Sequence, residues 1–187
     1  HQIIGKSVKR RDIPAKVTGK AQFGMDVRLP GMVYAAIAQC PVFGGSLKSF
    51  DGAKAKDRKG VKRVFALPAT STSAAAVAVV ADRYWQAHTA LAEVAIVWDD
   101  GPHATHDSAA QRARYAALLA TGKAREYESV GNVDTALAAP EKAVTADYFV
   151  PYLAHAAMEP INCTAVVNPG KACDIWVGNQ APTLVRM

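Results

Sequence analysis

The sequence lacks the features that mark a membrane-spanning or disulfide-stapled protein. Its longest apolar run covers residues 74–81, well short of the roughly 20 residues that cross a bilayer. No charged stretch followed by an apolar one opens the chain, so no signal peptide is expected. The three cysteines, Cys40, Cys163 and Cys173, show no C-x-x-C or Cys/His metal spacing. We therefore expect a soluble chain without a disulfide framework or zinc site, with the cysteines as small buried hydrophobic residues.

Acidic residues are scarce in the first third of the sequence. Residues 1–63 hold fourteen Lys and Arg against four Asp, whereas residues 64–187 hold eight basic and twelve acidic residues. The basic cluster between Lys54 and Arg63 has no interleaved aromatic side chains and no basic helix that could contact bases in a groove. This argues against a nucleic-acid partner. A solvated face, or a surface that docks onto an acidic neighbouring domain or subunit, explains this charge better.

Strand and helix signals alternate between residues 32 and 98. Apolar runs predict strands at 32–39, 61–67, 76–81 and 93–98, the third being buried on both faces. Asp51 and Asp82 are suitable N-caps for short helices that end near Gly60 and Leu91. Residues 1–31 are rich in Gly and Pro, which predicts an extended, turn-rich lead-in. This pattern is typical of a compact α/β or α+β unit.

The pattern changes after residue 99. A polar loop is followed by a predicted helix at 108–121, stopped by Gly122, and by a short helix at 134–139. Three further strands are predicted at 143–150, 154–167 and 172–177. The sequence thus divides into a first domain (1–99), a helical connector (100–142) and a β-rich part (143–187), and the α+β class is predicted overall.

Two loops could bind ligands, but each has a simpler explanation. His103, His106 and Asp107 could hold a metal if their loop folded back on itself, yet a solvated loop before a helix N-terminus explains them better. The Gly44-Gly45 pair could bring backbone amides to a phosphate, although a tight turn is the default interpretation. We therefore assign no metal site.

Polar residues in the last part of the chain are the stronger candidates. His155, Glu159 and Cys163 would share one face of an unbroken strand, so a Cys–His nucleophile with Asn162 as orienting group is conceivable. Asn162 would point the other way, however, and Pro160 bends the strand. Glu159 fits a structural hydrogen bond or ion pair, with a role in a site as the alternative. Gln180, at a strand end, can donate and accept at once, which suits a metal-oxo group as well as backbone.

The residues also support a resemblance to a known family. The first hundred residues contain the motifs Gly5-Lys6, RDIPAKVTGKA (11–21), GMDVRLPGMVYA (24–35), CPVFGG (40–45), Gly60-Val61, VAVVAD (77–82) and YWQA (84–87). Together these motifs resemble the α/β hammerhead domain of the xanthine dehydrogenase and aldehyde oxidase family of molybdenum hydroxylases, in the isoquinoline 1-oxidoreductase β-subunit branch. Residues 155–165 and 176–182 resemble the opening strands of the molybdopterin-binding domain that follows.

This resemblance implies a large subunit that oxidises an aldehyde or N-heterocycle with oxygen from water. The implied cofactor is molybdopterin cytosine dinucleotide with molybdenum, and Gln180 matches the glutamine that hydrogen-bonds the molybdenum oxo ligand. His155 and Glu159 match structural positions beneath it. Implied partners are the remainder of the large subunit, a [2Fe-2S] small subunit and a c-type cytochrome acceptor, with a periplasmic or membrane-associated location.

The family's glycine-rich cofactor loops and catalytic glutamate have no counterpart in residues 1–187. We therefore expect an incomplete portion of the cofactor domain, with no catalytic residue of its own, which binds no cofactor and is inactive alone. The alternative function is a non-catalytic scaffold or interaction module that docks through the basic N-terminal surface. We also expect Trp85 and Trp98 in the first core and Trp176 more exposed.

Overall fold

The computed structural model describes residues 2–121, 124–170 and 172–185. The chain forms two compact units. One consists of residues 31–146, and the other combines residues 1–30 with residues 147–187. The predicted helix stop at Gly122 lies outside the described residues.

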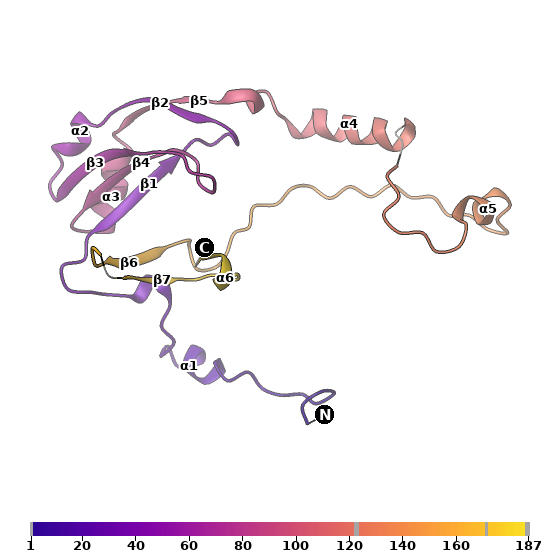
Figure 1. The fold of residues 1–187 in the computed structure, drawn as a ribbon, viewed down its shortest axis with the longest axis horizontal. Helices are drawn as coiled ribbons and strands as arrows, with labels where there is room; N and C mark the ends of the chain where they lie inside the picture. The colour runs from indigo at the N-terminus through magenta and orange to yellow at the C-terminus, as the bar shows by residue number, and fades with distance from the viewer. Residues whose placement is uncertain (1, 122–123, 171, 186–187) are drawn as a thin grey trace. The chain divides into compact units, whose positions relative to one another are not determined.

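A three-stranded antiparallel sheet forms the centre of the 31–146 unit (Figure 1). Strand β4 (Ala76–Ala81) lies between β1 (Tyr34–Gln39) and β3 (Val61–Leu67). Five of its six residues are buried, so the prediction that this apolar run is buried on both faces is confirmed. An uninterrupted apolar sequence is favoured in a strand whose side chains are buried on both faces.

A second, two-stranded antiparallel ribbon joins β2 (Ser46–Asp51) to β5 (Ala95–Asp99). The pairing shifts register between Leu47 and Ser49, so Lys48 is an extra residue on its strand. Such a bulge brings Leu47 and Phe50 to the same side, and both are partly buried against the core. The sequence pattern did not predict β2.

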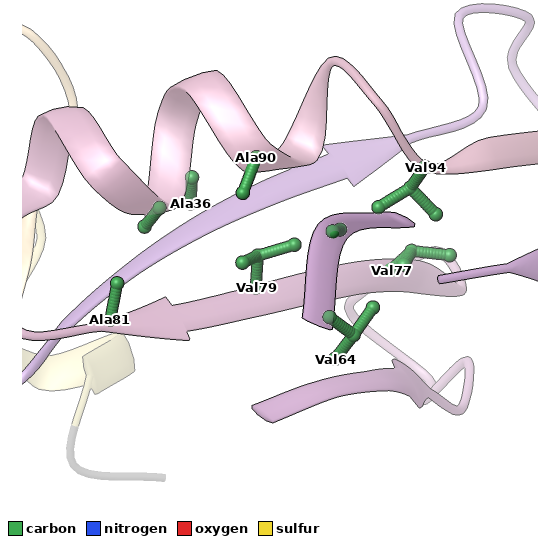
Figure 2. Packing of buried hydrophobic residues seen from close by; sticks show 9 residues of the cluster. Ala36, Val64, Val77, Val79, Ala81, Ala90 and Val94 are labelled. Carbon is green, nitrogen blue, oxygen red and sulfur yellow. The ribbon is translucent and has the colours of Figure 1, made fainter. Parts of the chain in front are cut away.

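Helix α3 (Tyr84–Leu91) covers the sheet and contacts β1 and β4. Its buried residues are Ala87 and Ala90, the second of which is labelled in Figure 2. Side chains this small let the helix backbone approach the sheet closely. Arg83, not Asp82, is the N-cap residue. The expected core position of Trp85 is wrong, because this side chain on α3 is 63% exposed.

The buried cluster is built mainly from valine and alanine (Figure 2). Short α2 (Ala53–Lys56) contributes Ala55 to it. Its N-cap residue is Gly52, not the predicted Asp51, although Asp51 accepts a hydrogen bond from the Ala53 amide at 2.9 Å. Trp98 packs against the cluster from β5, which confirms its predicted place. The cluster members are Ala36, Ala55, Val64, Val77, Val79, Ala81, Ala87, Ala90 and Val94.

The rest of this unit contains the 3-10 turn η2 (Gly101–His103) and two helices. Helix α4 covers Ser108–Thr121 as predicted. Helix α5 (Val133–Ala138) begins one residue earlier than expected, because the Asn132 side chain caps it by accepting a hydrogen bond from the Thr135 amide. Residues 143–150 form no strand, and that prediction is wrong.

The 1–30 and 147–187 unit contains the hairpin of β6 (Cys163–Val167) and β7 (Cys173–Val177). Helix α1 (Ile13–Val17) interrupts the predicted extended lead-in, with Pro14 in the first turn, where its missing N–H costs no hydrogen bond. Turn η1 (Gly24–Asp26) follows it, and α6 (Pro182–Val185) comes after β7. Residues 154–162 are not part of a strand, so β6 is much shorter than predicted.

The combination of antiparallel strands and short helices confirms the predicted α+β class. No helix in the described part of the chain has both the length and the apolar character to cross a membrane. The division at residues 99 and 142 remains a prediction about domains.

Candidate functional site

The carboxylate of Glu159 joins three segments of the 1–30 and 147–187 unit. The Met25 backbone N–H of η1 donates to Glu159 Oε1 at 3.3 Å, and Asn162 Nδ2 donates to the same oxygen at 3.0 Å. Asn162 Nδ2 also donates to the Pro160 carbonyl at 2.8 Å. We call Gly24, Met25, Glu159, Asn162 and Gly178 the Glu159 junction. The structural interpretation of Glu159 therefore has two specific donors to support it.

Two glycines make this junction possible. A Cβ atom on Gly24 would lie 2.5 Å from Asn162 Oδ1 and 3.2 Å from Glu159 Oε1. A Cβ atom on Gly178, which follows β7, would lie 3.3 Å from Glu159 Oε2. The 2.5 Å distance to Asn162 Oδ1 is shorter than a non-bonded contact allows. Position 24 therefore has no room for a side chain while the Asn162 side-chain amide stays in place.

A cavity of about 410 Å³ lies beside the junction. Gln180 lines it from the bend between β7 and α6, and the Asn179 side chain accepts a hydrogen bond from the Ala181 amide, which fixes that bend. No residue in the ranges 2–121, 124–170 and 172–185 forms a hydrogen bond with the side chain of Gln180 or with that of His155. The polar residues of the cavity wall are His155, Glu159, Asn162, Asn179 and Gln180.

These polar groups differ in what they can still bind. Glu159 and Asn162 already bond to each other and to the backbone. Gln180 and His155 have no such partner in the described part of the chain, and both are exposed. The structure therefore brings together four of the residues singled out from the sequence, His155, Glu159, Asn162 and Gln180. It leaves Gln180 and His155 able to contact a ligand.

A larger cavity of about 780 Å³ also has Glu159 in its wall. Its wall comes from residues 22–29 and from the end of β7, and Glu159 and Gly178 line both cavities. Arg28 does not extend freely into it, because its Nη1 donates to the carbonyls of Met25 and Val27 at 2.6 and 2.8 Å. Two members of the Glu159 junction are thus wall residues of both cavities.

Sequence reasoning found Glu159 but missed Gly24 and Met25 as its partners. The contact between Met25 and Glu159 spans 134 residues, and nothing in either segment's local pattern signals it. Asn162 was considered only as the orienting group of a nucleophile. The structure gives it the different task of holding the Glu159 carboxylate.

The proposed nucleophile arrangement of His155, Glu159 and Cys163 does not form. Residues 155–160 are not a strand, so the alternation that would align the three side chains does not apply. Cys163 opens β6 and does not line the cavity of Gln180. Cys163 and Cys173 are exposed, so their expected burial is wrong, while Cys40 is half-buried; all three are free thiols.

The loop around His106 is occupied by local hydrogen bonds. Asp107 Oδ1 accepts from the backbone amides of Ala109 and Ala110, both at 2.9 Å, at the start of α4. His106 Nε2 lies 2.8 Å from Gln111 Oε1. The interpretation as a loop before a helix N-terminus is confirmed, and the described residues contain no cluster of His, Cys, Asp and Glu able to hold a metal.

The Gly44-Gly45 pair forms the predicted tight turn. The Gly45 amide donates to the Val42 carbonyl at 3.0 Å, and Gly44 has φ +80°, which favours glycine. A Cβ atom on Gly45 would collide with Cys40 Sγ. Close packing, not phosphate binding, accounts for the second glycine.

Part of the basic surface between Lys54 and Arg63 is neutralised within its own unit. Arg58 Nε donates to Glu93 Oε2 at 2.8 Å, and its Nη2 bonds the other carboxylate oxygen. This hydrogen-bonded pair lowers the pKa of Glu93 and raises the pKa of Arg58. Lys62 Nζ lies 2.7 Å from Asp82 Oδ1. Two of the six basic groups thus have acidic partners.

Comparison with known proteins points to one family. Residues 118–187 match the molybdopterin cofactor-binding domain. The chain is 29% identical to isoquinoline 1-oxidoreductase subunit beta of Brevundimonas diminuta, over 98% of this chain and 24% of that protein. It is 28% identical to a membrane-bound aldehyde dehydrogenase [pyrroloquinoline-quinone] of Gluconacetobacter polyoxogenes, over 98% and 24%. Quinoline 2-oxidoreductase of Pseudomonas putida 86 aligns with 65% of this chain and 18% of its own, at 21% identity and TM-score 0.44.

The family model and the curated relatives agree with the resemblance found in the sequence motifs: the chain is similar to large, molybdopterin-binding subunits of molybdenum hydroxylases. The chain spans about a quarter of the length of the two curated relatives described above.

Proposed function

We propose that the chain is part of the large subunit of a molybdenum hydroxylase that oxidises an aldehyde or an N-heterocycle with oxygen derived from water. The observation that carries this proposal is the position of Gln180. It lies in the cofactor-binding match at 118–187, at the wall of a cavity, with its amide available for a ligand. The printed names of relatives that act on isoquinoline and on aldehydes support the two substrate classes.

The residues of this cavity fit one edge of a molybdopterin cofactor. The Gln180 amide can donate to one oxygen and accept from another group, and His155 offers a second polar contact beside it. Bound at this edge, the cofactor would supply two-electron redox chemistry that no side chain can provide. We propose the cytosine dinucleotide form, in keeping with the resemblance to the isoquinoline 1-oxidoreductase branch.

The chain's own residues act by orientation at this edge. Glu159 is placed to hold structure, since its Oε1 already accepts from Met25 and Asn162. A general base must have a free lone pair directed at the proton it removes, and Gln180 cannot take up a proton in the neutral range. We therefore assign Gln180 to binding and orienting, not to proton transfer.

The proposed partners follow from the same family relationship. They are the remainder of the large subunit, a [2Fe-2S] small subunit that receives the electrons, and a c-type cytochrome as acceptor. The word "subunit" in one relative's name and "membrane-bound" in another's support an assembly located in the periplasm or at the membrane.

Gln180→Ala in the complete enzyme tests this proposal. Because Gln180 is exposed, the fold should persist, while kcat should fall on the order of 10²-fold, as for loss of one preorganised donor. Val167→Ala is the matched control: this apolar side chain on β6 lines neither cavity and is 69% exposed, so its removal should leave kcat nearly unchanged. Molybdenum content is measured on both variants.

Wild-type turnover by Gln180→Ala at normal molybdenum content would contradict the assignment of this residue. If the complete protein contained no molybdenum, this would contradict the proposal that it is a molybdenum hydroxylase. That second result would favour the alternative, an interaction module that uses Lys54, Lys56, Lys59 and Arg63 as its docking face.

A further inference from the structure

The N-terminal segment at η1 contributes to the site although it lies far from Gln180 in sequence. We infer that Gly24 is a positioning residue, which keeps the Glu159 junction closed and thereby fixes the bend that carries Gln180. The role given to Gln180 rests on the proposed function. The mechanical link from Gly24 to that bend rests on this structure alone.

The first step is the arrangement of segments around one carboxylate. On one side, Glu159 Oε1 accepts from the Met25 amide and from Asn162. On the other side, Glu159 Oε2 lies close enough to Gly178 that a Cβ there would be 3.3 Å away. Gly178 precedes Gln180 by two residues, so a displaced carboxylate pushes directly on the bend.

The second step is that Asn162 cannot give way at low cost. Its Oδ1 is shielded from solvent and has no hydrogen-bond partner in the described part of the chain, and it is the atom that a Cβ on Gly24 would strike at 2.5 Å. Turning the amide away breaks the Nδ2 bonds to Glu159 and Pro160. A side chain at position 24 must therefore disturb Glu159 as well.

The third step is that Glu159 and Gly178 are shared by both cavities. Opening the junction therefore changes the wall of the smaller cavity, which contains Gln180, and at the same time the wall of the larger one. Gly24 does not line the smaller cavity that contains Gln180, because it lines only the larger cavity. Its effect on the site can only be indirect.

Hydrogen–deuterium exchange on the full-length protein tests this inference without relying on activity. Gly24→Ala should speed exchange at least about threefold in peptides covering 159–167 and 173–181, because the junction that holds both is opened. Gly19→Ala is the matched control. Gly19 has φ +67°, and no atom lies within 4 Å of a Cβ added to it. The alanine substitution therefore strains the backbone of the same segment without contacting the junction.

The control separates lost stability from lost positioning. Gly19→Ala should lower Tm through its unfavourable φ but leave exchange in 159–167 and 173–181 unchanged. A double-mutant cycle with Asn162→Ala adds a second criterion. Once the amide is gone, adding Gly24→Ala should change the exchange rates much less than it does in the wild-type protein.

Glu159→Gln provides the test if Gly24→Ala does not accumulate. It keeps the side-chain shape but weakens the bond from Met25, so exchange should rise in 22–29 and in 173–181. Unchanged exchange in 173–181 for either variant, or an equal effect of Gly24→Ala with and without Asn162, would overturn the inference. A failed Gln180→Ala experiment would overturn the proposed function and leave these exchange results standing.

Discussion

At the scale of single residues, the Arg58–Glu93 pair gives a pH-dependent contribution to stability. The hydrogen bonds from Arg58 lower the pKa of Glu93 in the folded protein. A carboxylate with a lowered folded-state pKa contributes stability above its ordinary pKa of about 4.3, and that stability is lost as the pH falls through the folded-state value. The pair therefore helps the fold at neutral pH and progressively less in acid.

Glu93→Gln should accordingly flatten the dependence of Tm on pH below about 5, because the group that titrates is removed. Thermal melts followed by circular dichroism at a series of pH values measure this. Glu141→Gln serves as control, since Glu141 is exposed and makes no ion pair in the part of the chain that the structure describes. An unchanged slope for Glu93→Gln would show that the pair does not form in solution.

Also at this scale, the sequence predicted the role of Glu159 but not its partners. A carboxylate among small and apolar residues needs donors, which made a structural hydrogen bond the favoured interpretation. The donors come from Met25 and Asn162. The first is a backbone amide, which carries no residue-type signal, so only coordinates could identify it.

At the scale of elements, β4 is the strand on which the first unit depends. Val79→Ala should lower the free energy of unfolding by roughly 2–3 kcal/mol, through lost burial and the cavity left behind, since Val79 is fully buried in the central strand. Val97→Ala on β5 is the control: this valine is 48% exposed and its loss should cost less than about 1 kcal/mol. Urea denaturation of both variants compares them, and equal losses would contradict the assigned core.

The elements also show which sequence patterns were sufficient. Residues 76–81 are apolar throughout, so this strand can be predicted without knowing which side chains point to which face. In β2 the apolar Leu47 and Phe50 are three apart, and the bulge at Lys48 restores them to one side. A simple alternation rule therefore misses it.

Residues 143–150 illustrate the opposite error. Their side chains favour a strand, but strand propensity reflects packing against neighbours more than backbone preference. In the described part of the chain no partner strand pairs with them, and they are exposed coil. A local pattern cannot supply the neighbouring strand that a sheet requires.

At the scale of the whole molecule, the candidate site depends on the two ends of the sequence. Residues 1–30 and 147–187 form one compact unit, and the Glu159 junction is the hydrogen-bonded contact between its N-terminal and C-terminal parts. Folding of this unit therefore requires loop closure over the intervening residues, which makes it a late step compared with the local pairing of β6 and β7.

The number of ligand groups in this unit decides what residues 1–187 can do by themselves. Holding a cofactor as large as molybdopterin dinucleotide takes a pocket that encloses most of its surface and places several polar groups around it, whereas the cavity beside the junction offers the side chains of Gln180 and His155. The isolated residues 1–187 should thus retain no molybdenum after gel filtration, whereas the proposed complete subunit should carry it. Elemental analysis of both, with circular dichroism to verify that the isolated chain is folded, makes the comparison. Stoichiometric molybdenum in a folded chain of residues 1–187 would mean that backbone donors around Gln180 hold the cofactor unaided.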